Sequence, residues 1–357
     1  MSSFRRGLFN RSPLVLLAAL LVLVPVLYAV DDCFSSGRWT AVPLEYWLRK
    51  SSDDYVYVSW VVGKIKRDPP DTPSVYLLGG SAAREAVVSG PSLAADVREE
   101  GGPEVAAWDL GSMNQNFAQS LAVADNVPAT PTYLLVGVGL GRFTSDRGAS
   151  FKQSEGRELL LPSRFLQQYV AETYGKYTYT TTILPGVFSQ LTSHVQEQGD
   201  ELLRGRIPRR TYGQHRYNLK GNHTVAEKER MVKVWNTRRY PKFQRNLAFH
   251  LDMLEQLLVR AQQRGLHVAL VELPLNREVV GDRFDFALEE YREPVEALAD
   301  EYEVPYVDFN EELDIASRDF HDLSHLVEAG RVVWQRRLAR EVVEIMGETS
   351  GHGGVPQ

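Results

Sequence analysis

The longest apolar stretch of the chain lies close to its N-terminus, where residues 13–30 carry no charged side chain and consist mainly of Leu, Val and Ala. This length is at the lower end of what a helix needs to cross the hydrocarbon core of a bilayer, which is about 30 Å thick. The pattern therefore predicts one transmembrane helix, with the membrane as a partner of the chain.

Charged residues flank this stretch asymmetrically: Arg5, Arg6 and Arg11 precede it, and Asp31 and Asp32 follow it. Because basic flanks stay in the cytoplasm, we expect residues 1–12 to form a cytoplasmic tail and the chain after the membrane to be extracellular. A cleaved signal peptide would have the same orientation, but its apolar region spans only about 7–15 residues and ends in a small-x-small site. Residues 27–29 match such a site poorly, which favours an uncleaved, single-pass anchor in the cell membrane.

Beyond the membrane segment, short apolar runs alternate with amphipathic stretches. The runs indicate buried parallel strands, because they are short and bounded by Gly, Pro or Asp; they occupy residues 74–78, 105–110, 133–137, 267–273 and 304–309. Helical patterns cover residues 82–97, 116–124, 245–264, 282–301 and 328–346. This order predicts an α/β fold with a doubly wound, mainly parallel sheet of about five strands. In such a sheet, chemistry collects at the carboxyl ends of the strands.

Three segments fall outside this alternation. Residues 31–73 connect the membrane to the sheet and are rich in aromatic side chains, which favours either contacts with lipid headgroups or a packed helix. Residues 144–244 are polar and rich in Tyr, Thr and Arg. We expect them to form an insertion after the third strand, either a cap over the functional site or a docking surface. The Gly-rich tail at residues 347–357 is expected to be disordered, which leaves residues 74–346 as the α/β domain.

Composition narrows the classes of function. The 357 residues carry a formal net charge of −6, which gives no reason to expect nucleic acid as a partner. Basic residues cluster locally, at Arg204, Arg206, Arg209 and Arg210 and again at Arg238, Arg239 and Lys242. Such clusters are most often a solvated face; a surface for an anionic polymer or a lipid headgroup is the alternative. Cys33 is the only cysteine, so an intramolecular disulfide and a cysteine-based metal site are excluded.

A serine at the end of the first predicted strand is a candidate for chemistry. Ser81 directly follows Gly79 and Gly80, and a helical pattern begins immediately after it. A serine at this turn lies at the carboxyl edge of the sheet, near the positive end of the next helix. The glycines allow a sharp turn and the close approach of a substrate. The alternative is that Ser81 only caps the helix.

The loop after the last predicted strand contains Asp322 three residues before His325. At this spacing the carboxylate can contact the imidazole and fix its tautomer, which leaves the second ring nitrogen free to act as a base. The roles are those of an activated nucleophile: Ser81 attacks, His325 takes and returns the proton, and Asp322 orients the ring. His321 adds a metal alternative with these two residues, but the helical His-Glu-x-x-His spacing of a catalytic zinc site is missing, and we expect no metal.

These motifs resemble those of the SGNH (GDSL-like) hydrolases. In that family's terms, the nucleophile block matches Gly79, Gly80 and Ser81, the second block matches residues 109–112, and the last block matches Asp322 and His325. The resemblance implies that the backbone N–H groups of Ser81 and Gly111 belong to an oxyanion hole, and it implies no cofactor.

The resemblance covers residues 74–143 and 245–345. It is closest to the membrane-anchored, extracytoplasmic branch that takes part in alginate O-acetylation and teichoic-acid D-alanylation. It therefore implies an esterase or an O-acyltransferase acting on an envelope polysaccharide or another acyl acceptor, with an integral-membrane acyl-transfer partner. The alternative is a non-catalytic binding or assembly component of an envelope polysaccharide system.

The chain departs from the family in the third block, which normally offers an Asn as the side-chain donor of the oxyanion hole. No Asn occurs in residues 136–143, and losing one such donor typically costs about 10²- to 10³-fold in rate. Asn114 and Asn116 are candidates to replace it, although each is equally placed to be a loop or helix-start residue. Arg142 is a further candidate, and we expect it to be solvated or to bind substrate.

Overall fold

The computed structural model describes residues 13–48, 50–129, 131–151, 159–175, 177, 179, 205, 210–213 and 221–351 of the chain. The predicted cytoplasmic tail, much of the predicted insertion and residues 352–357 of the predicted disordered tail lie outside this description.

Five parallel strands form one sheet in the order β2-β1-β3-β4-β5, which confirms the predicted α/β class. The strands are β1 (Ser74–Leu78), β2 (Ala106–Asp109), β3 (Thr132–Val138), β4 (His267–Glu272) and β5 (Tyr306–Val307). The chain moves to one side of β1 to form β2 and then to the other side to form β3. Such a reversal creates a crevice outside the carboxyl ends of the two strands, where ligands of open α/β sheets bind.

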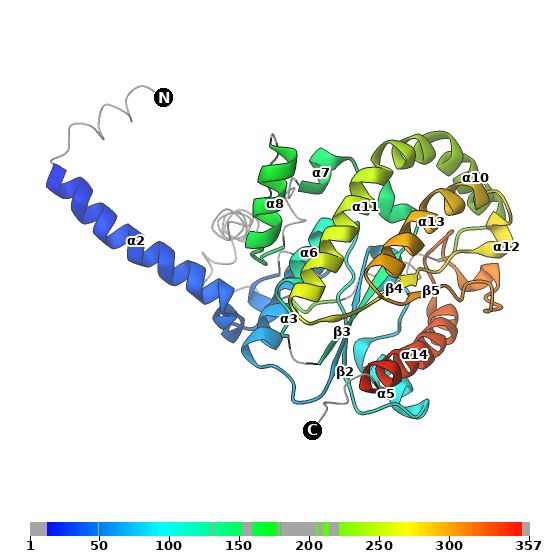
Figure 1. Ribbon diagram of the computed structural model, residues 1–357, viewed down its shortest axis with the longest axis horizontal. Helices are drawn as coiled ribbons and strands as arrows, with labels where there is room; N and C mark the ends of the chain where they lie inside the picture. Colours follow the sequence, from blue (N-terminus) through cyan, green and yellow to red (C-terminus); the bar gives the residue numbers. More distant parts are fainter. Residues whose placement is uncertain are drawn as a thin grey trace.

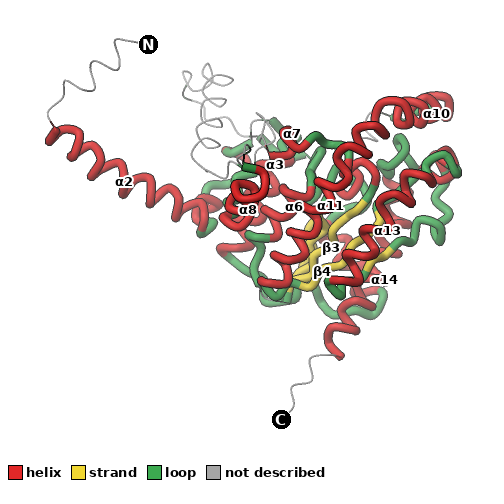
Figure 2. Tube along the Cα trace, turned by 45° about the horizontal axis from the view of Figure 1, so that its top comes forward, coloured by secondary structure: helices red, strands yellow, loops and turns green. Residues whose placement is uncertain are grey.

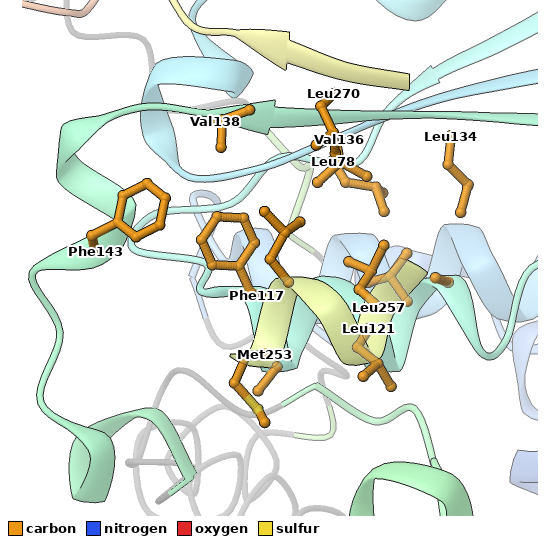
Figure 3. Close-up of a cluster of buried hydrophobic side chains, with 14 of the residues drawn as sticks. Leu78, Phe117, Leu121, Leu134, Val136, Val138, Phe143, Met253, Leu257 and Leu270 are labelled. Carbon is orange, nitrogen blue, oxygen red and sulfur yellow. The ribbon is translucent and has the colours of Figure 1, made fainter. Parts of the chain in front are cut away.

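Helices cover both faces of the sheet (Figure 1). One face carries α3 (Asp54–Arg67), α6 (Phe117–Ala124), α11 (Tyr240–Gln263) and α13 (Asp285–Glu301), and the other carries α5 (Gly90–Glu99) and α14 (Glu328–Gly351). Figure 3 shows the first interface: Leu78, Val136 and Leu270 of the strands lie over Phe117 of α6 and Leu257 of α11. Burying each such side chain contributes roughly 1.5–3 kcal/mol.

The predicted helix at residues 82–97 is divided in two. Helix α4 (Ser81–Arg84) ends after one turn, and α5 starts again at Gly90. Pro91 lacks the N–H that a continuous helix requires at this point, and the Ser89 side chain accepts a hydrogen bond from Ser92 N at 3.2 Å to cap the new helix. A Cβ at Gly90 would lie 2.2 Å from the Ala107 carbonyl oxygen, so glycine lets α5 pack directly against β2.

The insertion after β3 contains α7 (Arg147–Phe151), α8 (Arg164–Tyr174) and α10 (Val225–Val234). Helix α10 runs into α11 through a π-helical turn, Trp235–Arg239, in which the Tyr240 N–H bonds to the Trp235 carbonyl. The predicted boundary at residue 244 therefore falls inside a helix that continues to Gln263. Turns of this kind widen a helix by one residue and occur frequently at functional sites.

Helix α2 (Pro13–Ser35) contains the predicted membrane segment and projects away from the α/β body (Figures 1 and 2). Its stretch Leu17–Ser35 has a mean hydropathy of 2.0 and is 6% buried, so it is long and apolar enough to cross a membrane. An N-terminal helix of this composition fits both an uncleaved anchor and a signal peptide.

The segment between the apolar helix and the sheet is packed: its first part forms an aromatic cluster, and its last part joins the core of the α/β domain. The rings of Phe34 and Trp39 stack with centroids 5.3 Å apart, and Trp47 meets Trp39 edge-on at 5.1 Å. Helix α3 follows, with Val58 and Val62 fully buried in the main core. Of the two alternatives for this aromatic-rich region, residues 54–67 therefore adopt the packed helix.

Candidate active site

The turn between β1 and α4 places Ser81 at the carboxyl edge of the sheet. Gly79 has a φ of 159°, and a Cβ there would lie 2.6 Å from the Ala83 Cβ, so the sharp turn requires glycine. Gly80 is the N-cap residue and Ser81 is the first residue of the helix. Ser81 is therefore not the cap, and its hydroxyl is available at the helix N-terminus.

The structure brings Ser81, His325 and Asp322 together in series. His325 Nε2 lies 2.8 Å from Ser81 Oγ, and His325 Nδ1 lies 2.7 Å from Asp322 Oδ2 and 2.8 Å from Oδ1. Ser81 and His325 are 244 residues apart in the sequence, so this contact depends on the tertiary fold. All three groups are partly accessible, as a site that receives a substrate requires.

The Asp322 carboxylate is held in its ionised form. Burial alone would raise the pKa of Asp322, but the His325 ring and the backbone N–H groups of Ser324 and His325 donate hydrogen bonds to it and hold its pKa well below the usual range. An ionised carboxylate at Nδ1 keeps the proton on that nitrogen and leaves Nε2 as the acceptor that faces Ser81.

Side chains from two other segments fix the loop that carries Asp322 and His325. Asn276, which caps helix α12 (Arg277–Val280), is fully buried and donates from Nδ2 to the Asp322 carbonyl at 3.1 Å. Lys228 of α10 donates to the carbonyl of Phe320 at 2.8 Å and to that of Ser317 at 2.5 Å. The insertion thus helps to position the histidine loop.

A buried ion network lies behind the nucleophile. Arg84, on the same short helix as Ser81, pairs with Asp54 of α3 and with Glu85. Arg331 of α14 pairs with Glu85 and donates to the Leu326 carbonyl at 2.9 Å. Arg84, Glu85 and Arg331 are at most 1% exposed, so the network ties the Ser81 turn to the histidine loop through groups that water does not screen.

A cavity of about 570 Å³ opens in front of Ser81 and His325. Its walls come from seven segments of the chain, which surround the carboxyl ends of β1, β3 and β4. The lining residues include Ser81, Asn114, Arg142, Ser145, Met231, Trp235, Arg239, Lys242, Glu272, Phe284, Leu288, Asp322 and His325. The volume lies within the usual range of small-molecule sites.

Of the residues expected in the oxyanion hole, Asn114 lines the cavity, whereas Asn116 and the Gly111 N–H form hydrogen bonds within the protein. Asn114 lines the cavity and has a φ of 58°, a left-handed conformation that Asn tolerates better than most residues. Asn116 is the N-cap of α6: its Oδ1 accepts from Gln119 N at 2.9 Å and its Nδ2 donates to the Ser150 carbonyl at 3.3 Å. The Gly111 N–H is donated to Asp109 Oδ1 at 3.0 Å. The oxyanion-hole expectation for Asn116 and Gly111 does not fit this geometry.

Arg142 is buried, contrary to the expectation that it is solvated. It is 5% exposed, its Nη1 and Nη2 donate to the Gly137 carbonyl and to Ser120 Oγ, and its guanidinium lies 3.9 Å from the centroid of the Phe117 ring. Burial lowers the pKa of Arg142 to about 9. Arg142 reaches the cavity wall, but the terminal nitrogens expected to bind substrate are held by the protein.

Glu272, at the end of β4, is a cavity residue that sequence reasoning missed. It is 2% exposed and accepts hydrogen bonds from the hydroxyl groups of Tyr291 and Tyr306. Burial raises its pKa to about 7, with a further contribution from the Asp308 charge. The sequence signal was only a Glu at the end of an apolar run, which does not distinguish a surface residue from a buried one.

His321 does not join Asp322 and His325 in a metal cluster. Its ring lies against that of His223, with centroids 4.6 Å apart, and its backbone N–H donates to the His325 carbonyl at 2.7 Å. Among the described residues, no group of three or more His, Cys, Asp or Glu side chains is arranged to hold a metal ion.

Fold and site together define a five-stranded parallel α/β protein with Ser, His and Asp hydrogen-bonded in series at the carboxyl edge of the sheet. No protein-family model and no curated protein matches the sequence. Among solved structures, the chain is similar to a lipase/acylhydrolase from Enterococcus faecalis, with 11% identity and a TM-score of 0.38 over 76% of this chain and 96% of that one. It is also similar to a protein from Bacillus subtilis, with 12% identity and a TM-score of 0.36 over 81% of this chain and 60% of that one. Neither similarity assigns the chain to a family.

Proposed function

We propose that this protein is a serine acyl enzyme, an esterase or an O-acyltransferase, with Ser81 as the nucleophile. The observation that carries the proposal is the pair of contacts at His325, 2.8 Å from Nε2 to Ser81 Oγ and 2.7 Å from Nδ1 to Asp322 Oδ2. Both lie within the range of about 2.6–3.2 Å that a general base requires.

In the first half of the reaction, Ser81 Oγ attacks the carbonyl carbon of an ester and gives its proton to His325 Nε2. We assign the backbone N–H of Ser81 and the side-chain amide of Asn114 as hydrogen-bond donors to the carbonyl oxygen, on which negative charge develops. When the tetrahedral intermediate collapses, His325 protonates the leaving alcohol and the acyl group stays on Ser81. Water or an acceptor hydroxyl then removes the acyl group through the same steps.

The N-terminal helix supports a location for this chemistry. With arginines before α2 and aspartates after it, the α/β body would lie at the outer face of the cell membrane. A catalytic domain held there can receive acyl groups from an integral-membrane partner and pass them to an envelope polysaccharide, as the resemblance to the SGNH branch suggests. We therefore favour transfer to an envelope glycan as the native activity, with ester hydrolysis as its side reaction.

Hydrolysis of 4-nitrophenyl acetate by the full chain in detergent tests the chemical part of this proposal. We expect Ser81→Ala and His325→Ala to remove the catalysed rate. Ser145→Ala is the matched control, because Ser145 lines the same cavity, whereas the hydroxyl that is hydrogen-bonded to His325 Nε2 is that of Ser81. Equal rates for the wild type and Ser81→Ala would refute Ser81 as the nucleophile.

A non-catalytic binding component is the second candidate. It is favoured by one observation, the commitment of the Gly111 N–H to Asp109, since an oxyanion hole with fewer donors is weaker. The same assay separates the two functions, because a binding component would not raise the rate of ester hydrolysis above the uncatalysed rate at any pH.

A further inference from the structure

One wall of the cavity is a stripe along the continuous helix formed by α10, the π-helical turn and α11. Met231, Trp235, Arg239 and Lys242 recur at helical spacing on this stripe and all line the cavity. The first two are apolar, and Trp235 is 5% exposed. The last two are exposed cations. The stripe is therefore apolar at Met231 and Trp235 and basic at Arg239 and Lys242, and it faces the same cavity as Ser81.

Arg239 and Lys242 have no partner among the residues that the structure describes. In the part of the chain that the structure describes, neither Arg239 nor Lys242 forms an ion pair or a hydrogen bond through its side chain. Other basic residues around the site do have partners: Lys228 holds the histidine loop, and Arg283 pairs with Glu229 of α10. Two free cations facing a cavity create a positive potential that favours an anion.

A third positive charge lies under the cavity. Arg142 donates to a carbonyl and a hydroxyl, neither of which carries negative charge, and its Nε has no partner among the described residues. Its positive charge is therefore not neutralised by a carboxylate, and burial weakens the screening of its field by water.

The two carboxylates that line the cavity offset this potential only in part, because three cations face one ionised carboxylate and one that is partly protonated. Asp322 is bound by the His325 ring. The pKa of Glu272 is raised to about 7 by burial and by the Asp308 charge, so this group is partly protonated near neutral pH. Both carboxylates also accept hydrogen bonds within the protein.

We propose that the substrate carries an anionic group, a carboxylate or a phosphate, which binds Arg239 and Lys242 while its ester lies at Ser81. Trp235, with Phe284 and Leu288 of the neighbouring segment, contacts the apolar or ring portion between the two ends. This inference rests on the proposed function, since it describes the substrate of the same site.

Matched esters test the inference on the full chain in detergent. On the alcohol side, 4-acetoxybenzoate and 4-acetoxyphenyl phosphate are compared with neutral 4-acetoxybenzamide. On the acyl side, 4-nitrophenyl monosuccinate is compared with 4-nitrophenyl acetate. We expect at least one anionic ester to have a kcat/KM about tenfold or more above that of its neutral partner, as charge-assisted hydrogen bonds provide. The ester that shows the preference distinguishes carboxylate from phosphate.

Substitutions then assign the preference to the two cations. Arg239→Gln and Lys242→Gln should each lower the anionic-to-neutral ratio of kcat/KM by about tenfold, mainly through KM. Raising the salt from about 0.1 M to 1 M should lower the wild-type ratio, because the Debye length falls from about 10 Å to 3 Å. The charge-matched control is the double variant Arg238→Gln with Arg245→Gln; both residues are exposed on the same helix but do not line the cavity. This control should keep the wild-type ratio.

Equilibrium binding separates this inference from the proposed function. Inorganic phosphate and 4-acetoxybenzoate are titrated into the Ser81→Ala chain, with and without Arg239→Gln and Lys242→Gln. Binding that these two substitutions remove supports the anion site, even if no ester is hydrolysed and the proposed function fails. Ser81-dependent hydrolysis of neutral esters, with no anionic preference on either side and no such binding, would overturn the inference alone.

Discussion

Arg331 offers a test of the network that joins the nucleophile to the histidine loop. Its side chain is 1% exposed, pairs with the buried Glu85 next to α4, and donates to the Leu326 carbonyl next to His325. The substitution Arg331→Met keeps most of the volume but removes the charge that faces a fully buried carboxylate. Breaking a buried pair from one side costs about 3–5 kcal/mol.

That cost corresponds to a fall of roughly 6–20 °C in Tm for a domain of this size, at about 2–4 °C per kcal/mol. The assay is thermal unfolding followed by circular dichroism at neutral pH in a fixed detergent. Arg336→Met, exposed on the same helix, is the control and should stay within about 0.5 kcal/mol of the wild type.

A double variant tests whether Arg331 and Glu85 contribute to stability as a coupled pair. Adding Glu85→Gln to Arg331→Met removes a buried carboxylate that has lost one of its two cationic partners and keeps only Arg84, so it should recover part of the lost stability rather than add to the loss. If Arg331→Met unfolds at the wild-type temperature, or if the double variant is less stable by the sum of the two single effects, the network does not act as a coupled unit.

Three further predictions concern the site. Asn114→Ala should lower kcat for ester hydrolysis about 10²- to 10³-fold. Asn116→Ala should instead cost about 1 kcal/mol of stability, because α6 loses its cap, and leave kcat unchanged. Equal effects of the two substitutions on kcat would contradict Asn114 as the oxyanion-hole donor. Asp322→Asn should lower kcat about 10³- to 10⁴-fold with little change in KM, because an amide no longer holds the His325 tautomer, and pre-steady-state kinetics on a folded variant checks this. The pKa of Glu272 is raised from 4.5 to about 7, so its contribution to stability is full below about pH 4.5 and is lost as the pH rises through about 7. The free energy of unfolding of Glu272→Gln, relative to that of the wild type, should therefore increase from pH 5 to pH 8 by as much as about 3 kcal/mol. Urea unfolding of both proteins at pH 5 and pH 8 measures this increase. The same relative free energy at both pH values would exclude Glu272 as the titrating group.

Local patterns were sufficient to predict the sheet and the site candidates. Each strand coincides with a short apolar run that has its own boundaries, so its position could be predicted without knowledge of its neighbours. The Gly79-Gly80-Ser81 turn and the Asp322-x-x-His325 loop are likewise encoded within a few residues. The topology then determines that both lie at the same edge of the sheet.

Features that depend on distant partners were not predicted. The pairing of Glu85 with Arg331 joins residues 246 apart in the sequence. The burial of Arg142 contradicted the expectation of a solvated arginine, because charged side chains are rarely buried and the pattern around it gives no sign of its partners. The π-helical turn at Trp235 shifts the helix stripe by one residue, which a regular helical period does not predict.

The central claim is that Ser81 is activated by His325, and labelling with a fluorophosphonate tests it most directly. Such a reagent reacts with an activated serine and stays bound to it. The account predicts one label per chain, located on Ser81 by mass spectrometry, with labelling that is slowed by Asp322→Asn and lost in His325→Ala. A folded wild-type chain that takes up no label, or that is labelled on another residue while Ser81 stays free, would contradict it.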